Sequence, residues 1–446
     1  MICIRNATLI NEGLRRRADV LLDGERILSV RDVGSPVPGE GYPPIIDATG
    51  LWLLPGLIDD QVHFREPGLT HKGDIRSESR AAVAGGITSF IDMPNTLPQT
   101  VTVDALNDKF ERAARQSAAN YALAIGATND NLPELKKAGA ARAAAVKIFM
   151  GASTGNMLVD NPDTLEKLFS EIDKIIAVHC ESEAIIRANK EKYSRLTGGN
   201  PDISFHPKIR SREACYASSS EAVALAKKHG TRLHLFHLST AEEMALLSAG
   251  PLKEKRITGE VCVHHLWFSD DDYARLGNRI KWNPAIKTKA DREALRQALR
   301  EGKLDVVATD HAPHTWEEKQ GSCLQAASGA PMVQHALTVM LELCRQGVFT
   351  PELVVEKMAH APAELFGIRD RGYIREGYYA DLVLVDPRQS WTVTPDNLLY
   401  KCGWSPLEGT TFSHKVLKTF VNGSLVYDEG RFDEQFRGKE LSYDTN

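Results

Sequence analysis

Residues 55–68 read Pro-Gly-Leu-Ile-Asp-Asp-Gln-Val-His-Phe-Arg-Glu-Pro-Gly. The run Leu57–Val62 predicts a short β-strand that ends immediately before His63. From Gly56 to about Gly367 the chain repeats one pattern, in which a short β-branched run is followed by a polar loop and a longer helical stretch. Such alternation is typical of parallel βαβ units.

Eight strands are predicted in this span, at Leu57–Val62, Ile87–Asp92, Tyr121–Ala127, Ala145–Phe149, Ile175–His179, Arg232–His237, Ile257–Val263 and Leu304–Thr309. Eight strands close a (β/α)8 barrel, the TIM barrel, and its typical size of about 250 residues fits once insertions are allowed. The sequence therefore predicts an α/β fold with a TIM barrel over residues 55–367. The alanine-rich stretch Ala138–Val146 is expected to form a helix that leads into the fourth strand.

Both ends of the chain show strand patterns. Residues Ala18–Asp32 alternate apolar and polar side chains around Asp23-Gly24, and Val416–Val426 does so around Asn422-Gly423, a strong hairpin signal. Asp381–Val385 has the same character. Because neither end alone has enough apolar surface for a core, residues 1–54 and 368–446 are predicted to build one small sheet domain together.

Composition restricts the class of protein. The 446 residues are 42% hydrophobic and 25% charged with a formal net charge of -5, which describes a globular chain without a basic surface for nucleic acid. Apolar runs fall short of the roughly 20 residues of a membrane span, and no secretory signal is evident. Seven cysteines without CxxC spacing indicate reduced thiols, so a cytoplasmic location is expected.

Polar residues stand at or near the carboxyl ends of five predicted strands: His63, Lys147, His179, His237 and Asp310. Barrel enzymes carry their chemistry at that end, where side chains from different strands can reach one point. Imidazole, carboxylate and water are the ligands of zinc or manganese in hydrolases. The set therefore predicts a metal centre with a small-molecule substrate.

Lys147 needs a separate explanation, because an ammonium beside a divalent cation is repelled and poorly solvated. A lysine with a lowered pKa can add carbon dioxide, and the resulting carbamate is an anionic bridging ligand. The alternative is a lysine that extends to the barrel rim and forms a salt bridge.

Several motifs resemble those of dihydroorotases, in the amidohydrolase superfamily. Residues 55–68 are similar to their first metal motif, and Ala308–His314, with Lys319 five residues on, is similar to their second signature. The likeness continues through residues 92–96, 146–151, 179–181, 237–239 and 283–284 and runs nearly end to end. The terminal segments resemble the composite β-sandwich that flanks the barrel in this superfamily.

The resemblance implies a role for each matching residue. Metal ligands would be His63, Lys147 as a carbamate, His179, His237 and Asp310, holding one or two zinc ions. Arg65, Asn95 and His314 would hold a substrate carboxylate, with Asn283 near the ring; an ordinary salt bridge to Glu66 or Asp74 is the alternative for Arg65. The resemblance also implies a homodimer.

One position departs from the family pattern. Most members have His-x-His after the first strand, whereas this chain has Gln61-Val62-His63. A glutamine oxygen binds zinc more weakly than imidazole does. Three outcomes stay open: Gln61 is a weak ligand, one metal is lost, or the chain is a non-catalytic homologue.

The implied activity is the reversible cyclisation of N-carbamoyl-L-aspartate to L-dihydroorotate in pyrimidine synthesis, with Asp310 as general acid and base. A hydantoinase, dihydropyrimidinase or allantoinase is the alternative enzyme. Other histidines and cysteines, including Cys180, His264, His265 and His311, are predicted to be structural, and Ser328–Gln334 is predicted to form a loop over the substrate.

Overall fold

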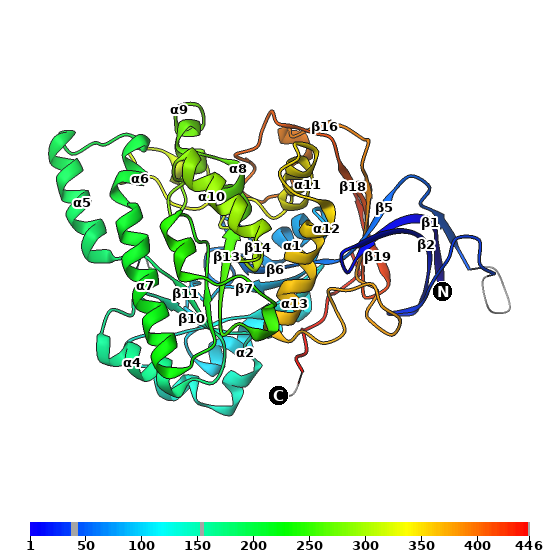
Figure 1. The fold of residues 1–446 in the computed structure, drawn as a ribbon, viewed down its shortest axis with the longest axis horizontal. Coiled ribbons are helices and arrows are strands. Elements are labelled where there is room, and N and C mark those ends of the chain that lie inside the picture. The colour runs from blue at the N-terminus through cyan, green and yellow to red at the C-terminus, as the bar shows by residue number, and fades with distance from the viewer. Residues whose placement is uncertain (37–42, 152–155, 445–446) are drawn as a thin grey trace.

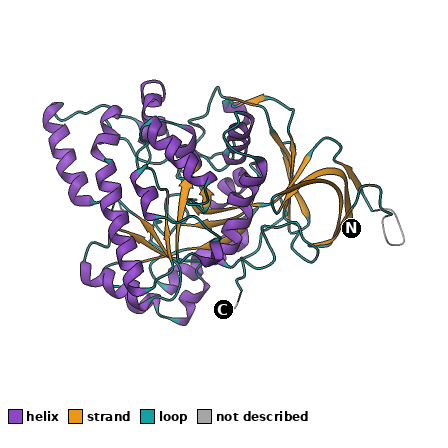
Figure 2. Cartoon of the chain, in the orientation of Figure 1, coloured by secondary structure: helices purple, strands orange, loops and turns teal. Residues whose placement is uncertain are grey.

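The computed structural model of the chain describes residues 1–36, 43–151 and 156–444. Within these ranges the chain has two kinds of sheet (Figure 1). Parallel strands lie among helices, whereas a second sheet combines strands from both ends of the chain, and Figure 2 shows few helices around it. The protein is thus an α/β protein with parallel sheets.

The parallel strands form two hydrogen-bonded groups, in the orders β6-β7-β8 and β14-β13-β12-β11-β10-β9. A bridge between Val62 and His311 links the end of β6 to the chain just past β14. The carboxyl ends of the first and last strands therefore lie side by side. The bounds are β6 Leu57–Val62, β7 Ile87–Asp92, β8 Asn120–Leu123, β9 Ile125–Gly126, β10 Val146–Phe149, β11 Ile176–His179, β12 Leu233–Leu235, β13 Ile257–Cys262 and β14 Val306–Ala308.

Two predicted elements differ from the structure. The predicted strand Tyr121–Ala127 is divided at Ala124, because the Ala124 amide bonds to Asp92 of β7 while the Ile125 amide bonds to Ala145 beside β10. The strand changes neighbours at this residue. The predicted helix in Ala138–Val146 is only a 3-10 helix, Ala138–Arg142.

Several of the longer helices have a capping residue at one end. The Asp74 side chain accepts a hydrogen bond from the Ser77 amide at the start of α1, and Gly230 ends α7 in the left-handed conformation that glycine tolerates. No helix within the described ranges is long and apolar enough to cross a membrane. The longer helices are α1 Ile75–Ala84, α2 Val103–Gln116, α4 Pro162–Glu171, α5 Glu183–Leu196, α7 Arg212–His229, α10 Lys289–Arg300 and α11 Ala336–Arg345.

The second sheet joins the two ends of the chain in the order β20-β19-β18-β15-β5-β1-β2-β3, with β4 on β1. Both expected hairpins are present, and the added Cβ of a residue at Gly423 would lie 2.0 Å from the Gly24 carbonyl oxygen, so the two turns touch. Its strands are β1 Ile2–Asn11, β2 Leu14–Asp23, β3 Arg26–Arg31, β4 Ile45–Asp47, β5 Trp52–Pro55, β15 Leu382–Asp386, β18 Lys415–Val421, β19 Ser424–Asp428 and β20 Arg431–Phe432.

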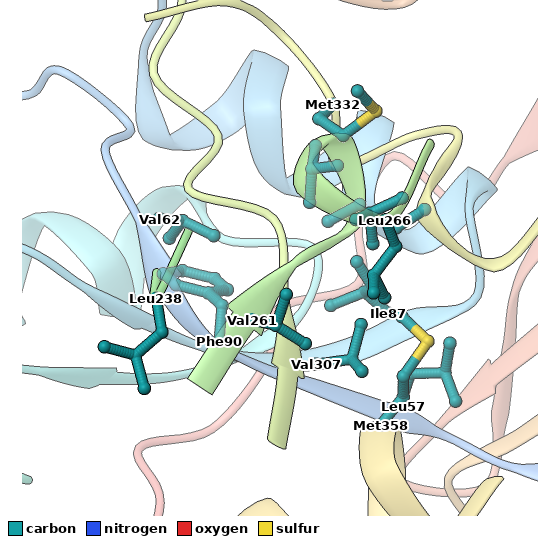
Figure 3. Packing of buried hydrophobic residues seen from close by; sticks show 14 of the residues in the cluster. Leu57, Val62, Ile87, Phe90, Leu238, Val261, Leu266, Val307, Met332 and Met358 are labelled. Atoms are coloured by element: carbon teal, nitrogen blue, oxygen red, sulfur yellow. The ribbon is translucent and has the colours of Figure 1, made fainter. Parts of the chain in front are cut away.

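Apolar side chains from the parallel strands pack into one buried cluster. Figure 3 shows Phe90 of β7, Val261 of β13 and Val307 of β14 in this cluster, together with Met358. All four are at most 2% exposed. This apolar packing fixes the strands and so fixes the positions of the polar residues at their carboxyl ends.

Candidate active site and metal centre

A cavity of about 580 Å³ opens at the carboxyl ends of the parallel strands. Its size suits a small-molecule ligand. Nine of the ten residues predicted for the site line it: Gln61, His63, Arg65, Asn95, His179, His237, Asn283, Asp310 and His314. The tenth, Lys147, is fully buried in β10.

His63 and Asp310 face each other across the first and last strands. His63 Nδ1 lies 2.7 Å from Asn95 Oδ1, and because that oxygen can only accept, Nδ1 carries the proton. His63 Nε2 lies 3.0 Å from Asp310 Oδ1. When His63 is neutral, its Nε2 and the Asp310 Oδ1 both point a lone pair at the other atom. A cation bound by both atoms would remove the repulsion between these lone pairs.

His179 and His237 form a second facing pair. His179 Nε2 lies 2.9 Å from a Glu181 oxygen and donates to it, since a carboxylate only accepts. Arg210 donates to the same oxygen at 2.5 Å, and its charge lowers the pKa of Glu181 to about 2 against the opposing effect of burial. The lone pair on His179 Nδ1 then points at His237 Nε2, 3.0 Å away.

These pairs suit a divalent metal. Two ligands bound at about 2.1 Å to one ion lie roughly 3.0 to 3.4 Å apart, depending on the angle between them. Both facing pairs, His63 with Asp310 and His179 with His237, have this separation. The donor set of imidazoles and carboxylate is that of zinc or manganese. The residues present therefore fit the metal centre that the sequence predicts.

Lys147 lies beneath the cavity in an apolar environment. Its side chain is fully buried, and its Nζ has no hydrogen-bond partner among the described residues. The Nζ lies 4.1 Å from the centre of the Phe236 ring and 4.7 Å from that of Phe149. Burial lowers the pKa of Lys147 to about 7, although Glu260 and Asp310 oppose this. The alternative of a rim lysine in a salt bridge is wrong.

Arg65 lies on the opposite wall of the cavity. Its Nε donates to the Pro313 carbonyl at 3.0 Å and its Nη2 donates to His314 Nε2 at 3.1 Å, and no carboxylate in the described chain pairs with it. Burial lowers the pKa of Arg65 to about 10. The alternative salt bridge is wrong, because Glu66 pairs with Arg112 and Asp74 pairs with Lys401. The remaining guanidinium donors are therefore free to bind an anion.

His314 and Asn283 complete this wall. Burial, together with the charge of Arg65, lowers the pKa of His314 to about 3, so its ring is neutral. The buried Oδ1 of Asn283 has no partner in the part of the chain that the structure describes. Within the predicted loop Ser328–Gln334, Ser328 and Gly329 line the cavity.

Three cavity residues have left-handed backbone conformations, which non-glycine residues seldom adopt. The φ angles are 70° at Arg65, 38° at His237 and 43° at Asp310. Such conformations cost about 1 to 3 kcal/mol each and occur most often at functional sites. β12 and β14 end two residues before His237 and Asp310, earlier than the sequence predicts.

Gln61 lines the cavity but also contacts the residues below it. Its Oε1 lies 3.9 Å from the Cys262 sulfur, and Cys262 donates to Glu260 at 3.3 Å. Two groups of ligand-type side chains in the described ranges have donor atoms within 4.8 Å of one another, and both lie outside the predicted set: Cys262, His264 and His265, and Asp60, His234 and Glu260. All six are buried, and burial raises the pKa of the Cys262 thiol, which keeps it protonated.

The remaining residues predicted to be structural have structural contacts. Cys180 is buried away from the cavity, and His264 stacks on Trp282 with the ring centroids 4.0 Å apart. His311 Nε2 lies 2.8 Å from Glu78, and its Nδ1 accepts from the Met332 amide. This pairing ties the loop after β14 to α1.

Lys72, Arg210 and Lys319 also belong to the site region, although no pattern in the sequence predicts their contacts. Lys72 Nζ lies 3.2 Å from His314 Nδ1, and Lys319 donates to the carbonyls of Ala327 and Gly329, both at 2.8 Å. None of the three follows a predicted strand. Glu181, in contrast, lies two residues after His179, so strand alternation predicts that both point the same way.

Comparisons with known proteins identify the family of the chain. The model of the amidohydrolase family matches residues 52–426. A dihydroorotase of Halobacterium salinarum is 36% identical over 432 residues, which cover 96% of this chain and 97% of that protein. An allantoinase of Bacillus velezensis is 31% identical over 435 residues, covering 96% and 94%.

Among solved structures, an L-hydantoinase (dihydropyrimidinase) from Arthrobacter aurescens superposes with a TM-score of 0.92 at 27% identity, and the match covers 99% of both chains. The expected resemblance is thus confirmed at the level of the family. The chain belongs to the amidohydrolase family.

Proposed function

We propose that the protein is a dihydroorotase, which interconverts N-carbamoyl-L-aspartate and L-dihydroorotate. The observation that carries this proposal is the buried guanidinium of Arg65, which lies at the cavity without a carboxylate partner among the described residues. Leaving it unpaired in the complex would cost several kcal/mol. The carboxylate of dihydroorotate supplies the missing partner, whereas hydantoin and dihydrouracil have none. Dihydroorotases among the relatives, at 31 to 36% identity, support the same choice.

The proposed metal ligands are His63, Lys147 as a carbamate, His179, His237 and Asp310, with Gln61 as a weak oxygen ligand. The family is in general metal-dependent. Zinc bound there would polarise the ring carbonyl and lower the pKa of water. The unpartnered Nζ of Lys147 supports the carbamate, because an amine with a pKa near 7 is partly neutral and nucleophilic at physiological pH.

The protein's own residues bind the substrate and move the proton. Arg65 binds the substrate carboxylate with its planar fork, and His314 and Asn95 orient the same group. Asn283 accepts from a ring N–H at its free Oδ1. In the hydrolytic direction Asp310 accepts a proton from the attacking water at a carboxylate oxygen and delivers it to the leaving amide nitrogen as the C–N bond breaks.

The finer architecture is part of the proposal. The parallel strands form an eight-unit TIM barrel over residues 55–367, and residues 1–54 and 368–446 form a composite β-sandwich, of which residues 37–42 and 445–446 lie outside the described part. The seven cysteines are free, which supports a reducing cytoplasmic location. A homodimer is proposed from the family resemblance.

The test is hydrolysis of L-dihydroorotate by the purified protein supplied with zinc and bicarbonate, with hydantoin, dihydrouracil and allantoin as comparison substrates. Turnover confined to dihydroorotate is expected. Turnover of the uncharged rings alone would reassign the enzyme as a hydantoinase. No turnover of any ring would favour the non-catalytic homologue.

Replacement of Arg65 by lysine should raise the KM for dihydroorotate about tenfold or more and change kcat little. A point charge cannot reproduce the two parallel hydrogen bonds that a guanidinium makes to a carboxylate. Steady-state kinetics measure the effect, with Arg16→Lys on the exposed part of β2 as the control. An unchanged KM would contradict the carboxylate role of Arg65.

Replacement of Glu181 by glutamine should weaken zinc binding by about 10- to 100-fold. The charged hydrogen bond from His179 Nε2 fixes that ring's tautomer and orientation, and such partners of ligand histidines have effects of this size. Competition with a chromophoric chelator measures the affinity, and exposed Glu171→Gln is the control. Equal affinities in both variants would show that Glu181 does not orient a ligand.

A further inference from the structure

A second and larger cavity, of about 840 Å³, lies at the opposite ends of the parallel strands from the candidate active site. We call it the basal groove. Its walls are formed by the residues at the starts of β12 and β13, by α13 (Ala361–Phe366) and by the chain that follows α13. Six of its side chains are basic: Arg232, Lys253, Lys255, Arg256, Arg371 and Arg375.

Three of these cations already have carboxylate partners. Lys255 pairs with Asp305 at 2.7 Å, Arg371 pairs with Asp381, and Arg375 pairs with Glu12 at 2.5 Å. The other three, Arg232, Lys253 and Arg256, form no ion pair in the described ranges. Three cations of the groove thus lack a carboxylate partner among the described residues, although the net charge of the chain is -5.

The acidic side chains of the groove do not offset this charge fully. Glu364 accepts from the Tyr373 hydroxyl, Asp370 pairs with Arg26 and Asp444 pairs with Arg369. Glu254 is the remaining acidic residue of the lining, and it has no ion pair in the part of the chain that is described. Two carboxylates, Glu254 and Glu364, the latter bonded only to the neutral Tyr373 hydroxyl, therefore face three free cations.

Strand register holds Arg232 and Arg256 close together. Each residue immediately precedes its strand, and the Leu233 amide donates to the Arg256 carbonyl at 2.8 Å. Arg232 is half-buried, and burial and the charge of Arg256 lower its pKa. Arg232 Nη2 bonds to the Leu365 carbonyl and Arg256 bonds to the Gly230 carbonyl, which leaves other N–H donors of both guanidinium groups unused.

Two adjacent guanidinium groups repel each other unless an anion lies between them. Planar forks of this kind match the oxygens of a phosphate group, and a lysine adds a further point charge. The cavity volume is within the range of small-molecule sites and exceeds what a phosphate ion alone requires. We infer that the basal groove binds a phosphate-bearing small molecule, whose phosphate contacts Arg232, Arg256 and Lys253.

This inference does not depend on the proposed activity, and it is tested by calorimetric titration of the full-length protein with inorganic tripolyphosphate. Saturable binding with a Kd below about 1 mM is expected at physiological ionic strength. The double variant Arg232→Gln/Arg256→Gln should weaken it at least tenfold. The control double variant Arg187→Gln/Arg195→Gln, on exposed α5, removes the same charge and should bind normally.

Two further measurements distinguish binding in the basal groove from binding at the active site or elsewhere on the surface. Binding of tripolyphosphate should be unchanged in the active-site variant Arg65→Gln; weaker binding there would locate the anion in the active site and overturn the inference. The double variant Lys253→Gln/Arg256→Gln, in which both replaced residues are exposed, should also weaken binding. This variant tests the inference even if the Arg232 variant does not fold. Equal weakening by the α5 control, or no saturable binding, would refute the groove as an anion site.

Discussion

Replacement of Asp310 by asparagine should lower kcat for dihydroorotate hydrolysis by about 10³-fold, within the usual range for a general acid and base. Asparagine has nearly the shape of aspartate but neither accepts nor delivers a proton at the reacting atoms. Asp310 also faces His63 Nε2 at 3.0 Å, so the variant loses an anionic ligand as well. The fold should be retained, because within the described ranges the Asp310 carboxylate bonds only to His63, which also lines the cavity.

Steady-state kinetics and thermal unfolding of the Asp310→Asn variant measure these effects. The matched control is Asp163→Asn, an exposed residue of α4, whose activity should equal that of the wild type. A loss of less than tenfold for Asp310→Asn would remove its role in proton transfer. A large fall in melting temperature would instead indicate a structural role.

Replacement of Lys147 by methionine should abolish activity and at the same time stabilise the protein. Methionine fills nearly the same volume, but it cannot add carbon dioxide or bind a metal as an anion. The Nζ of Lys147 is fully buried without a hydrogen-bond partner among the described residues, and such a group costs about 1 to 3 kcal/mol. Removal of the amine should therefore raise the free energy of unfolding of the metal-free protein by a similar amount.

Lys109 provides a matched control, because it is equally buried but has partners. Its Nζ lies 2.9 Å from Asp92 Oδ2 and donates to the Met93 carbonyl at 2.7 Å. Lys109→Met leaves a buried carboxylate unpaired and should destabilise the protein by about 3 to 5 kcal/mol. Chemical denaturation of both variants without metal measures the contrast. Destabilisation of the Lys147 variant by a similar amount would show that its amine has a structural partner.

The residues of the candidate site were largely predictable because the signal was local. Barrel-type strands are apolar, so the polar residues His63, His179 and Asp310 at or just beyond strand ends were conspicuous in the sequence. In the structure, nine of the ten predicted residues line one cavity. Strand lengths were less predictable. His237 and Asp310 have a left-handed φ, and no sequence periodicity reports a single strained residue.

The missed residues depend on partners that are distant in the sequence. Arg210 meets Glu181 after 29 residues, and Lys72 meets His314 after 242. The sequence does not show whether a charged residue in a loop is solvated or paired. These contacts can therefore be identified only in the folded structure. The same limitation applies to the basal groove, since its cations come from separate loops that strand register brings together.

The sheet that joins both ends of the chain has a consequence for biosynthesis. One edge of β5 pairs with β1, but its other edge pairs with β15, from Leu382 opposite Pro55 to Val385 opposite Trp52, more than three hundred residues later. During translation this apolar edge of β5 leaves the ribosome early. It stays unpaired until β15 has been synthesised. Unpaired strand edges promote aggregation, so the nascent chain depends on rapid completion or on chaperones until β15 arrives.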